Sequence, residues 1–345
     1  MYLSNLSQVL LRNEQLLLAT SPLLINMPDD ELSQSLNTLN QNCDITYFDN
    51  NYELHQQHLT KKHGQCIFAA HYQSNKKHDL VIINFPKSKQ ELLFTFAMLA
   101  ECTTKETRLL IVGENKSGIK SIDKLIKEQT SFCDKIDAAR HCLLFETQLA
   151  NHHLAFDIEE WFHYYSVSVN QLTFKVAALP GVFSQAKLDI GTQVLLNNLP
   201  DNISGEVLDF GCGAGVIACF VGLQSSDTSL TLADVSALAI ASSEKTLAIN
   251  NLTGNVITTN SLSNITGHFH YVISNPPFHQ GIKTHYAATE NFLTGIKKHL
   301  KKQGTLIIVA NSFLKYQPII EHSIAKAEKT CIQQGFTIYQ TCLRH

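Results

Sequence analysis

The sequence predicts an α/β protein built from two tandem copies of one unit. Short β-branched runs alternate with helix-like stretches in the second half of the chain, a pattern typical of a largely parallel sheet covered by helices. Related segments recur in the first half, and a length of 345 residues suits about two domains. We therefore expect domains at residues 1–160 and 161–345.

The second half contains five strand candidates separated by helical patterns. The strands are predicted at residues 206–210, 229–233, 256–259, 270–274 and 305–310. The helices are predicted at residues 214–223, 237–250 and 286–300. Two apolar runs around a glycine in residues 329–343 predict an antiparallel hairpin at the sheet edge, and residues 161–178 predict another hairpin between the copies.

The first half repeats two strand segments of the second. Residues 78–86 (HDLVIINFP) align with 270–277 (HYVISNPP), and residues 108–115 (RLLIVGEN) align with 305–311 (TLIIVAN). Duplication of one unit explains this most simply, and chance similarity between two βαβ units is the alternative. Residues 1–63 contain no glycine, whereas a turn that wraps a ligand needs sharply bent backbone. We expect the first copy to be degenerate and to have lost its cofactor site.

Composition excludes several classes of protein. Apolar residues make up 44% and charged residues 17%, as in ordinary globular proteins. No stretch approaches the ~20 apolar residues of a membrane span, and the N-terminus lacks signal-peptide features, so we expect a cytoplasmic protein. Nine scattered cysteines without a C-x-x-C pair predict reduced thiols, and no spacing of histidines predicts a metal site.

Charge predicts no extended nucleic-acid-binding surface. A net charge of −3 argues against a protein that coats nucleic acid by charge alone. A local basic face is still compatible with it, because Lys116, Lys120, Lys124 and Lys127 recur at helical spacing and further lysines occur in residues 296–302. A solvated helix face is the alternative for both groups.

A glycine-rich segment, Asp209–Gly215 (DFGCGAG), joins a predicted strand to a predicted helix. Its G-x-G-x-G pattern differs from the G-x-G-x-x-G of sites that seat a pyrophosphate on a helix N-terminus. S-adenosylmethionine (SAM) has no phosphate, and its positive charge suits the acid that precedes the glycines. We therefore predict that Asp209, Gly211, Gly213 and Gly215 bind SAM, with a structural tight turn as the alternative.

Two polar residues follow the next strands of the predicted sheet. Asp234 lies about twenty residues beyond the glycine turn, where an acid can accept hydrogen bonds from both hydroxyls of a ribose. This position does not separate NAD from SAM, and Asp234 and Ser236 also suit a helix N-cap. Asn260 and Ser261 follow the third strand and are candidates for contacts with the adenine edge.

The tetrapeptide Asn275-Pro-Pro-Phe278 follows the fourth strand, next to the first strand at the carboxyl edge of the sheet. The lone pair of an exocyclic amine is delocalised, and two acceptors, the Asn275 side-chain oxygen and the Pro276 carbonyl, can localise it. Fixed proline φ angles hold that carbonyl rigidly, and Phe278 can stack on a base for roughly 1–3 kcal/mol. We therefore predict Asn275, Pro276 and Phe278 as catalytic residues for amino-group methylation without a general base, with a plain turn as the alternative.

With these motifs, the second half resembles class I SAM-dependent methyltransferases that act on amino groups of bases. Nearly the whole chain resembles the ribosomal RNA small subunit methyltransferase C family, although the region before residue 60 matches poorly. The matching segments include residues 112–120 (VGENKSGIK), 180–184 (PGVFS) and 188–192 (LDIGT). The resemblance implies two tandem Rossmann-like domains, a degenerate first one that aids folding and substrate binding and a catalytic second one.

The resemblance also implies an activity, the transfer of a methyl group from SAM to N2 of one guanine in 16S rRNA within the small ribosomal subunit. It carries roles to the residues that match the family motifs: Asp209, Gly211, Gly213, Asp234, Asn275, Pro276 and Phe278. Asn275 is also expected beside the cofactor. Lys116, Lys120 and Lys283 join Phe278 as expected RNA contacts. We expect a monomer with no metal.

Three other functions are compatible with parts of the sequence. The sister methylation of a guanine N2 in 23S rRNA shares the duplicated architecture. Methylation of a glutamine amide in a protein poses the same –NH2 problem, but Phe278 stands where such enzymes tend to have tyrosine. A non-catalytic RNA-binding protein on a relic fold is the fourth hypothesis, against which the intact motifs of the second copy argue.

Overall fold

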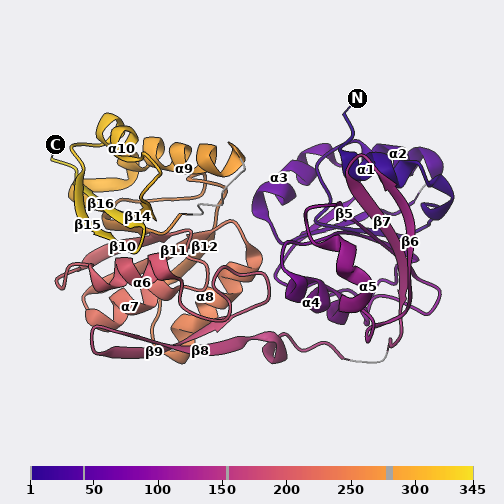
Figure 1. Ribbon diagram of the computed structural model, residues 1–345, viewed down its shortest axis with the longest axis horizontal. Coiled ribbons are helices and arrows are strands. Elements are labelled where there is room, and N and C mark those ends of the chain that lie inside the picture. Colours follow the sequence, from indigo (N-terminus) through magenta and orange to yellow (C-terminus); the bar gives the residue numbers. More distant parts are fainter. Residues whose placement is uncertain (1, 42, 153–154, 277–282, 345) are drawn as a thin grey trace. The chain divides into compact units, whose positions relative to one another are not determined.

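The chain forms two compact units, Met1–Trp161 and Phe162–His345, each with its own seven-stranded sheet (Figure 1). The computed structural model describes residues 2–41, 43–152, 155–276 and 283–344. Among these residues, no helix combines the length and apolarity that crossing a bilayer requires. The two units are described separately below.

The sheet of the second unit has the strand order β12-β11-β10-β13-β14-β16-β15. The first five strands run parallel, and β16 and β15 add to them antiparallel. The strands are β10 (Gly205–Phe210), β11 (Thr228–Asp234), β12 (Asn255–Thr258), β13 (Phe269–Ser274), β14 (Leu300–Asn311), β15 (Glu328–Gln333) and β16 (Phe336–Cys342). All five predicted parallel strands and the closing hairpin are confirmed.

The sheet of the first unit has the corresponding order β3-β2-β1-β4-β5-β7-β6, with the same division into parallel and antiparallel strands. The strands are β1 (Pro22–Ile25), β2 (Thr46–Asp49), β3 (Gln65–Phe68), β4 (Leu80–Asn84), β5 (Arg108–Glu114), β6 (Thr130–Ala139) and β7 (Cys142–Leu149). Because strand order and direction match one for one, the predicted pair of tandem Rossmann-like domains is confirmed.

Helices cover both faces of each sheet, and in the second unit α9 and α10 lie opposite α6, α7 and α8 (Figure 1). The helices of this unit are α6 (Ile190–Asn197), α7 (Val216–Gln224), α8 (Ala237–Ile249), α9 (Lys283–Gly295), η4 (Ile296–His299) and α10 (Gln317–Ser323). The first unit has α1 (Asn5–Leu11), η1 (Glu14–Leu16), α2 (Leu32–Leu39), α3 (Tyr52–Lys61), α4 (Lys89–Leu99), η2 (Ile119–Ser121), α5 (Ile122–Leu125) and η3 (Ile158–Trp161).

Two helix predictions need correction. The helix predicted to reach residue 300 ends at Gly295, and a 3-10 turn leads from it into β14. The four lysines from Lys116 to Lys127 do not share one helix face, because Gly118 takes a φ of 94° and starts a 3-10 turn between them. A residue with left-handed backbone interrupts an α-helix, so the spacing of these lysines does not indicate a shared helix face.

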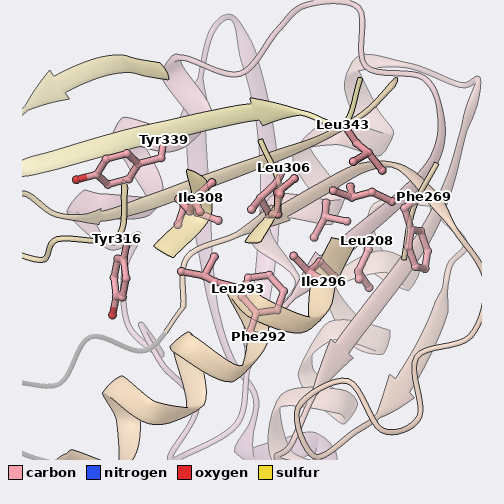
Figure 2. Packing of buried hydrophobic residues seen from close by; sticks show 14 of the residues in the cluster. Leu208, Phe269, Phe292, Leu293, Ile296, Leu306, Ile308, Tyr316, Tyr339 and Leu343 are labelled. Carbon is pink, nitrogen blue, oxygen red and sulfur yellow. The ribbon is translucent and has the colours of Figure 1, made fainter. Parts of the chain in front are cut away.

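An apolar cluster on one face of the second sheet supports the carboxyl ends of its central strands. Figure 2 shows Leu208 of β10 and Leu306 and Ile308 of β14 packed with side chains of α9 and η4. The rings of Phe210 and Phe292 stack with centroids 4.1 Å apart. Buried close packing of this kind resists movement, so residues that follow β10 and β13 extend from a firm base.

The hairpin predicted between the copies is confirmed as β8 (His163–Val169) and β9 (Leu172–Ala178). It packs on α8 through hydrogen bonds to polar side chains. Thr246 accepts a hydrogen bond from the backbone N–H of Ala177 at 3.0 Å, and Ser242 accepts one from Leu179 at 3.0 Å. The segment that leads to α6 is thereby tied to the second unit.

Candidate active site

The glycine turn of the second unit is a strand-to-helix connection with left-handed backbone. Gly211, Gly213 and Gly215 have φ angles of 70°, 54° and 75°. A Cβ atom added to Gly211 or Gly213 would meet nothing within 4 Å, whereas one on Gly215 would lie 3.1 Å from Ser243 of α8. Gly211 and Gly213 therefore leave open space beside the backbone, and Gly215 allows α7 and α8 to approach.

Asp209 is a buried carboxylate at the end of β10. It is 1% exposed, and its Oδ2 accepts a hydrogen bond from the backbone N–H of Ala218 at 3.0 Å. Within the described part of the chain its buried Oδ1 has no hydrogen-bond partner. Burial raises the pKa of Asp209 to about 7, and the nearby Asp234 adds to the shift. A hydrogen-bond donor or a positive charge beside the turn would satisfy this oxygen.

Asp234 connects the glycine turn to the start of α8. Its Oδ2 accepts a hydrogen bond from Gly213 N–H at 3.0 Å, and its Oδ1 accepts one from Ser236 N–H at 2.9 Å. The N-cap of α8 is Ser236 rather than Asp234. Each carboxylate oxygen keeps a further lone pair, so Asp234 can also accept hydrogen bonds from a ligand. Burial raises its pKa.

Asn260 lies in the turn after β12, at the same edge of the sheet. The turn is tied to the neighbouring strand because Thr259 N–H donates to the Asp234 carbonyl at 2.9 Å. The Asn260 carbonyl accepts hydrogen bonds from the backbone and hydroxyl of Ser263. Asn260 is half-buried. The structure thus brings the turn of Asn260 to Asp234, and Asp234 to the glycine turn.

Asn275 follows β13, the neighbour of β10 on the other side. Its Nδ2 donates hydrogen bonds to Thr192 Oγ1 at 2.8 Å and to Asp189 Oδ2 at 3.2 Å. Among the residues that the structure describes, none donates a hydrogen bond to its Oδ1. Asp189 is the N-cap of α6, and the next residue after Asn275, Pro276, is buried. The Asn275 oxygen, which can accept hydrogen bonds, therefore lies at the carboxyl edge of the sheet, next to β10, which leads into the glycine turn.

Two predicted residues have a limited structural description. Phe278 lies outside the described residues, as does its neighbour Pro277. Lys283 is the first residue of α9. The predicted roles of Phe278 and Lys283 therefore rest on the sequence alone.

Asp189 and Thr192 contact Asn275 but are absent from the site predicted by motif chemistry. In the sequence, Asp189 followed by Thr192 is typical of a helix start with an N-cap. Their contacts with Asn275 span 86 and 83 residues of chain. No local spacing carries that information, and only the resemblance of residues 188–192 marked the segment.

The first unit keeps the frame of this site but fills it with its own side chains. Asn26 has a φ of 50° and donates its N–H to Phe48 at 3.0 Å, as Gly211 donates to Ala233 at 2.8 Å. Asp49 ends β2 as Asp234 ends β11, yet it is fully buried and its Oδ2 lies 2.8 Å from Nδ1 of His58. This carboxylate is paired with a side chain of α3, and the described turn after β1 contains no glycine.

Lys116 and Lys120 are exposed residues of the first unit, beyond the carboxyl end of β5. Lys116 forms an exposed ion pair with Glu114 at 3.0 Å. Such pairs contribute little to stability, so the Lys116 ammonium can exchange this partner for another anion.

The histidine, cysteine and carboxylate side chains bear on the expected absence of a metal ion and of disulfides. In the described segments, no group of three or more histidine, cysteine, aspartate or glutamate side chains is arranged to hold a metal ion. All nine cysteines are free in the structure. Cys212 lies in the glycine turn, where burial raises its pKa and Ser243 Oγ lies 3.2 Å from its sulfur.

Comparisons with known families match both halves of the chain. The methyltransferase small domain matches residues 173–340, and the methyltransferase small domain N-terminal model matches residues 7–165. Together with the Rossmann-like sheet and its glycine turn, these matches define a methyltransferase with a second, related N-terminal domain.

Two curated relatives specify the family. The ribosomal RNA small subunit methyltransferase C of Colwellia psychrerythraea is 50% identical over 353 residues and covers 99% of both chains. That of Pseudoalteromonas translucida is 41% identical over 98% of this chain and 99% of the relative. The chain belongs to the ribosomal RNA small subunit methyltransferase C family.

A solved structure has the same two-unit fold. It is the T. thermophilus 16S rRNA N2 G1207 methyltransferase in complex with AdoMet and guanosine, with a TM-score of 0.81. The similarity covers 94% of this chain and 88% of that one at 18% sequence identity. The chain therefore shares the fold of this structure.

Proposed function

We propose that this protein transfers a methyl group from SAM to N2 of one guanine in 16S rRNA of the small ribosomal subunit. Family membership over the full chain supports the reaction, and the T. thermophilus relative was solved with AdoMet and guanosine. The observation that carries the proposal is the orientation of the Asn275 side chain. Its –NH2 group donates hydrogen bonds to Thr192 and Asp189, so its oxygen can accept a hydrogen bond from the amine that receives the methyl group.

The residues of the glycine turn fit SAM. Open space at Gly211 and Gly213 allows a ligand to approach the backbone, and the unpartnered Oδ1 of Asp209 suits a positively charged group. When bound, SAM supplies an electrophilic methyl group. Asp234 would accept hydrogen bonds from the ribose hydroxyls, and Asn260 would contact the adenine edge. Gly215 would support the turn by allowing α8 to pack closely.

The residues that follow β13 would make the guanine amine nucleophilic. The Asn275 Oδ1 and the Pro276 carbonyl each accept one hydrogen of the –NH2 group, which draws the nitrogen toward tetrahedral geometry. Phe278 stacks on the base. Methyl transfer would form the nitrogen–carbon bond as the carbon–sulfur bond of SAM breaks, and the methylated nitrogen would release a proton to water. No side chain is required as a base.

The two domains would divide the work between residues 1–160 and 161–345. We assign folding and RNA binding to the first domain, with Lys116 and Lys120 as phosphate contacts. Lys283 would contact the RNA beside the acceptor site. We place the reaction in the cytoplasm, where small ribosomal subunits are found, and expect a monomer that works without a metal ion.

The test is incubation of the protein with labelled SAM and small subunits that lack the modification. We expect label in a single guanine, identified as N2-methylguanine by mass mapping. Large subunits and ribosomal proteins serve as controls. Label confined to 23S rRNA would support the sister activity, label in a glutamine would support protein methylation, and no label with intact SAM binding would contradict the proposal.

A further inference from the structure

We propose that Asp189 and Thr192 are positioning residues that fix the amide of Asn275 with its oxygen toward the acceptor amine. This inference rests on the proposed function, because it assigns a reason for the orientation of a side chain in that reaction. Asn275 Nδ2 lies 2.8 Å from Thr192 Oγ1 and 3.2 Å from Asp189 Oδ2. Both partners belong to the first turn of α6.

The chemistry of the partners determines which amide atom faces them. An ionised carboxylate only accepts hydrogen bonds, so Asp189 requires the –NH2 end of Asn275. Thr192 Oγ1 lies 3.5 Å from the same Asp189 oxygen and can donate its hydrogen there, which leaves its lone pairs for Asn275. A rotated amide would set its oxygen against a carboxylate oxygen. The orientation thus follows from donor and acceptor types as well as from atomic positions.

The two positioning residues are themselves held by the start of the helix. Asp189 Oδ2 caps α6 by accepting a hydrogen bond from Thr192 N–H at 3.0 Å, and Thr192 is 7% exposed. Gly191 lies between them, where a Cβ atom would lie 2.7 Å from the Phe336 ring and 3.0 Å from Asp189 Oδ2. The turn therefore packs directly on β16, and its carboxylate and hydroxyl have little room to move.

Loss of this fixation would leave a mixture of amide orientations. In the rotated state, Asn275 would present N–H groups to the N–H groups of the acceptor amine, and no lone pair would be localised. Substitutions of residues that orient a catalytic side chain typically lower rates about 10- to 100-fold. The effect should fall on kcat, because neither Asp189 nor Thr192 contacts the glycine turn through any hydrogen bond found among the described residues.

The experiment compares Thr192→Val with Thr192→Ser. Valine keeps the shape of threonine and removes the hydroxyl acceptor, whereas serine keeps the hydroxyl. Methyl transfer to small subunits is measured in the steady state to give kcat, and SAM affinity is measured by calorimetry. We expect kcat to fall about 10- to 100-fold in the valine variant and to be largely retained in the serine variant, with SAM Kd within about twofold in both. Equal rates in both variants, or a parallel loss of SAM affinity, would overturn the proposal.

A double variant separates positioning from an independent effect. If Thr192 acts through Asn275, Thr192→Val combined with Asn275→Ala is no slower than Asn275→Ala alone. Multiplied losses would refute action through Asn275. A wild-type rate for Asn275→Ala would instead contradict the proposed mechanism, and an inactive wild-type protein would contradict the proposed function.

A second positioning variant covers the case in which Thr192→Val does not fold. Asp189→Asn retains a good N-cap but introduces an –NH2 group that can pair with a rotated Asn275 oxygen. We expect a lower kcat with an unchanged melting temperature and SAM affinity. An unchanged kcat in this folded variant would count against the proposal.

Discussion

Asn275 is the residue on which the proposed chemistry depends most directly. We expect Asn275→Ala to lower kcat about 10²–10³-fold, since it removes an acceptor aimed at the reacting amine. SAM Kd should stay within about threefold, because the hydrogen bonds of its side chain go to Thr192 and Asp189. Steady-state methylation kinetics and calorimetry check both values, with Asn198→Ala at the end of α6 as a matched control. A proportional loss of SAM affinity would make Asn275 structural.

Asp209 gives the stability of the protein a defined pH dependence. Its pKa is about 7 in the folded protein because burial disfavours the charged form, against an ordinary value of 3.8. A carboxyl group with a raised folded pKa favours folding fully below its unfolded pKa, and this contribution is lost as pH rises through about 7. Between pH 5 and pH 8 the expected loss is on the order of 2–3 kcal/mol.

Asp209→Asn tests this assignment, because asparagine does not titrate. Urea unfolding of both proteins at pH 5 and pH 8 should show a smaller decrease in the free energy of unfolding for the variant. An identical decrease in both proteins would mean that other groups cause the pH dependence.

Residue identities were more predictable than their orientations. The sequence motifs indicated Asp209, Asp234 and Asn275 because each lies at or directly after the carboxyl end of a strand with a recognisable β-branched run. The donors and acceptors that orient Asn275 come from Asp189 and Thr192, more than eighty residues earlier in the chain. Such contacts arise from tertiary packing, which local spacing does not encode.

At the scale of the element, the glycine turn assigns different tasks to its glycines. All three have left-handed φ angles, where a side chain costs about 1–2 kcal/mol per residue. We expect Gly211→Ala to lower SAM affinity more than its cost in stability explains, because its Cβ would enter the open space that we assign to the cofactor. Calorimetry alongside urea unfolding measures the two effects separately.

Gly215→Ala should give the opposite balance. Its Cβ would lie 3.1 Å from Ser243, so we expect a loss of stability larger than that of Gly211→Ala. Equal destabilisation by the two alanine variants would contradict the distinction.

Element boundaries show where the sequence is least informative. Strand β14 begins at Leu300, five residues before the predicted start, because Leu300 pairs with Phe269 across a register shift. The apolar run that identifies the strand begins only at Thr305. An irregular strand start depends on its neighbour in the sheet, and the same cause shortens the helix before it to Gly295.

At the scale of the whole molecule, two copies of one fold carry one open glycine turn among the residues that the structure describes. We expect calorimetry to give one SAM per chain, because His58 occupies the Asp49 carboxylate in the first unit. Asp234→Asn should weaken this single binding event, whereas Asp49→Asn should leave its affinity unchanged. Two binding events per chain would show that the first unit also binds the cofactor.

The paired side chains of Asp49 and His58 also bear on how the two copies diverged. Removal of His58 alone would take away the closest hydrogen-bond partner of a fully buried carboxylate and leave His55 Nδ1 4.0 Å away, so we expect it to lower stability. Recovery of a ligand site would further require glycines in place of side chains such as Asn26. Because each early step lowers stability before any binding returns, the specialisation of the first copy is difficult to reverse by single substitutions.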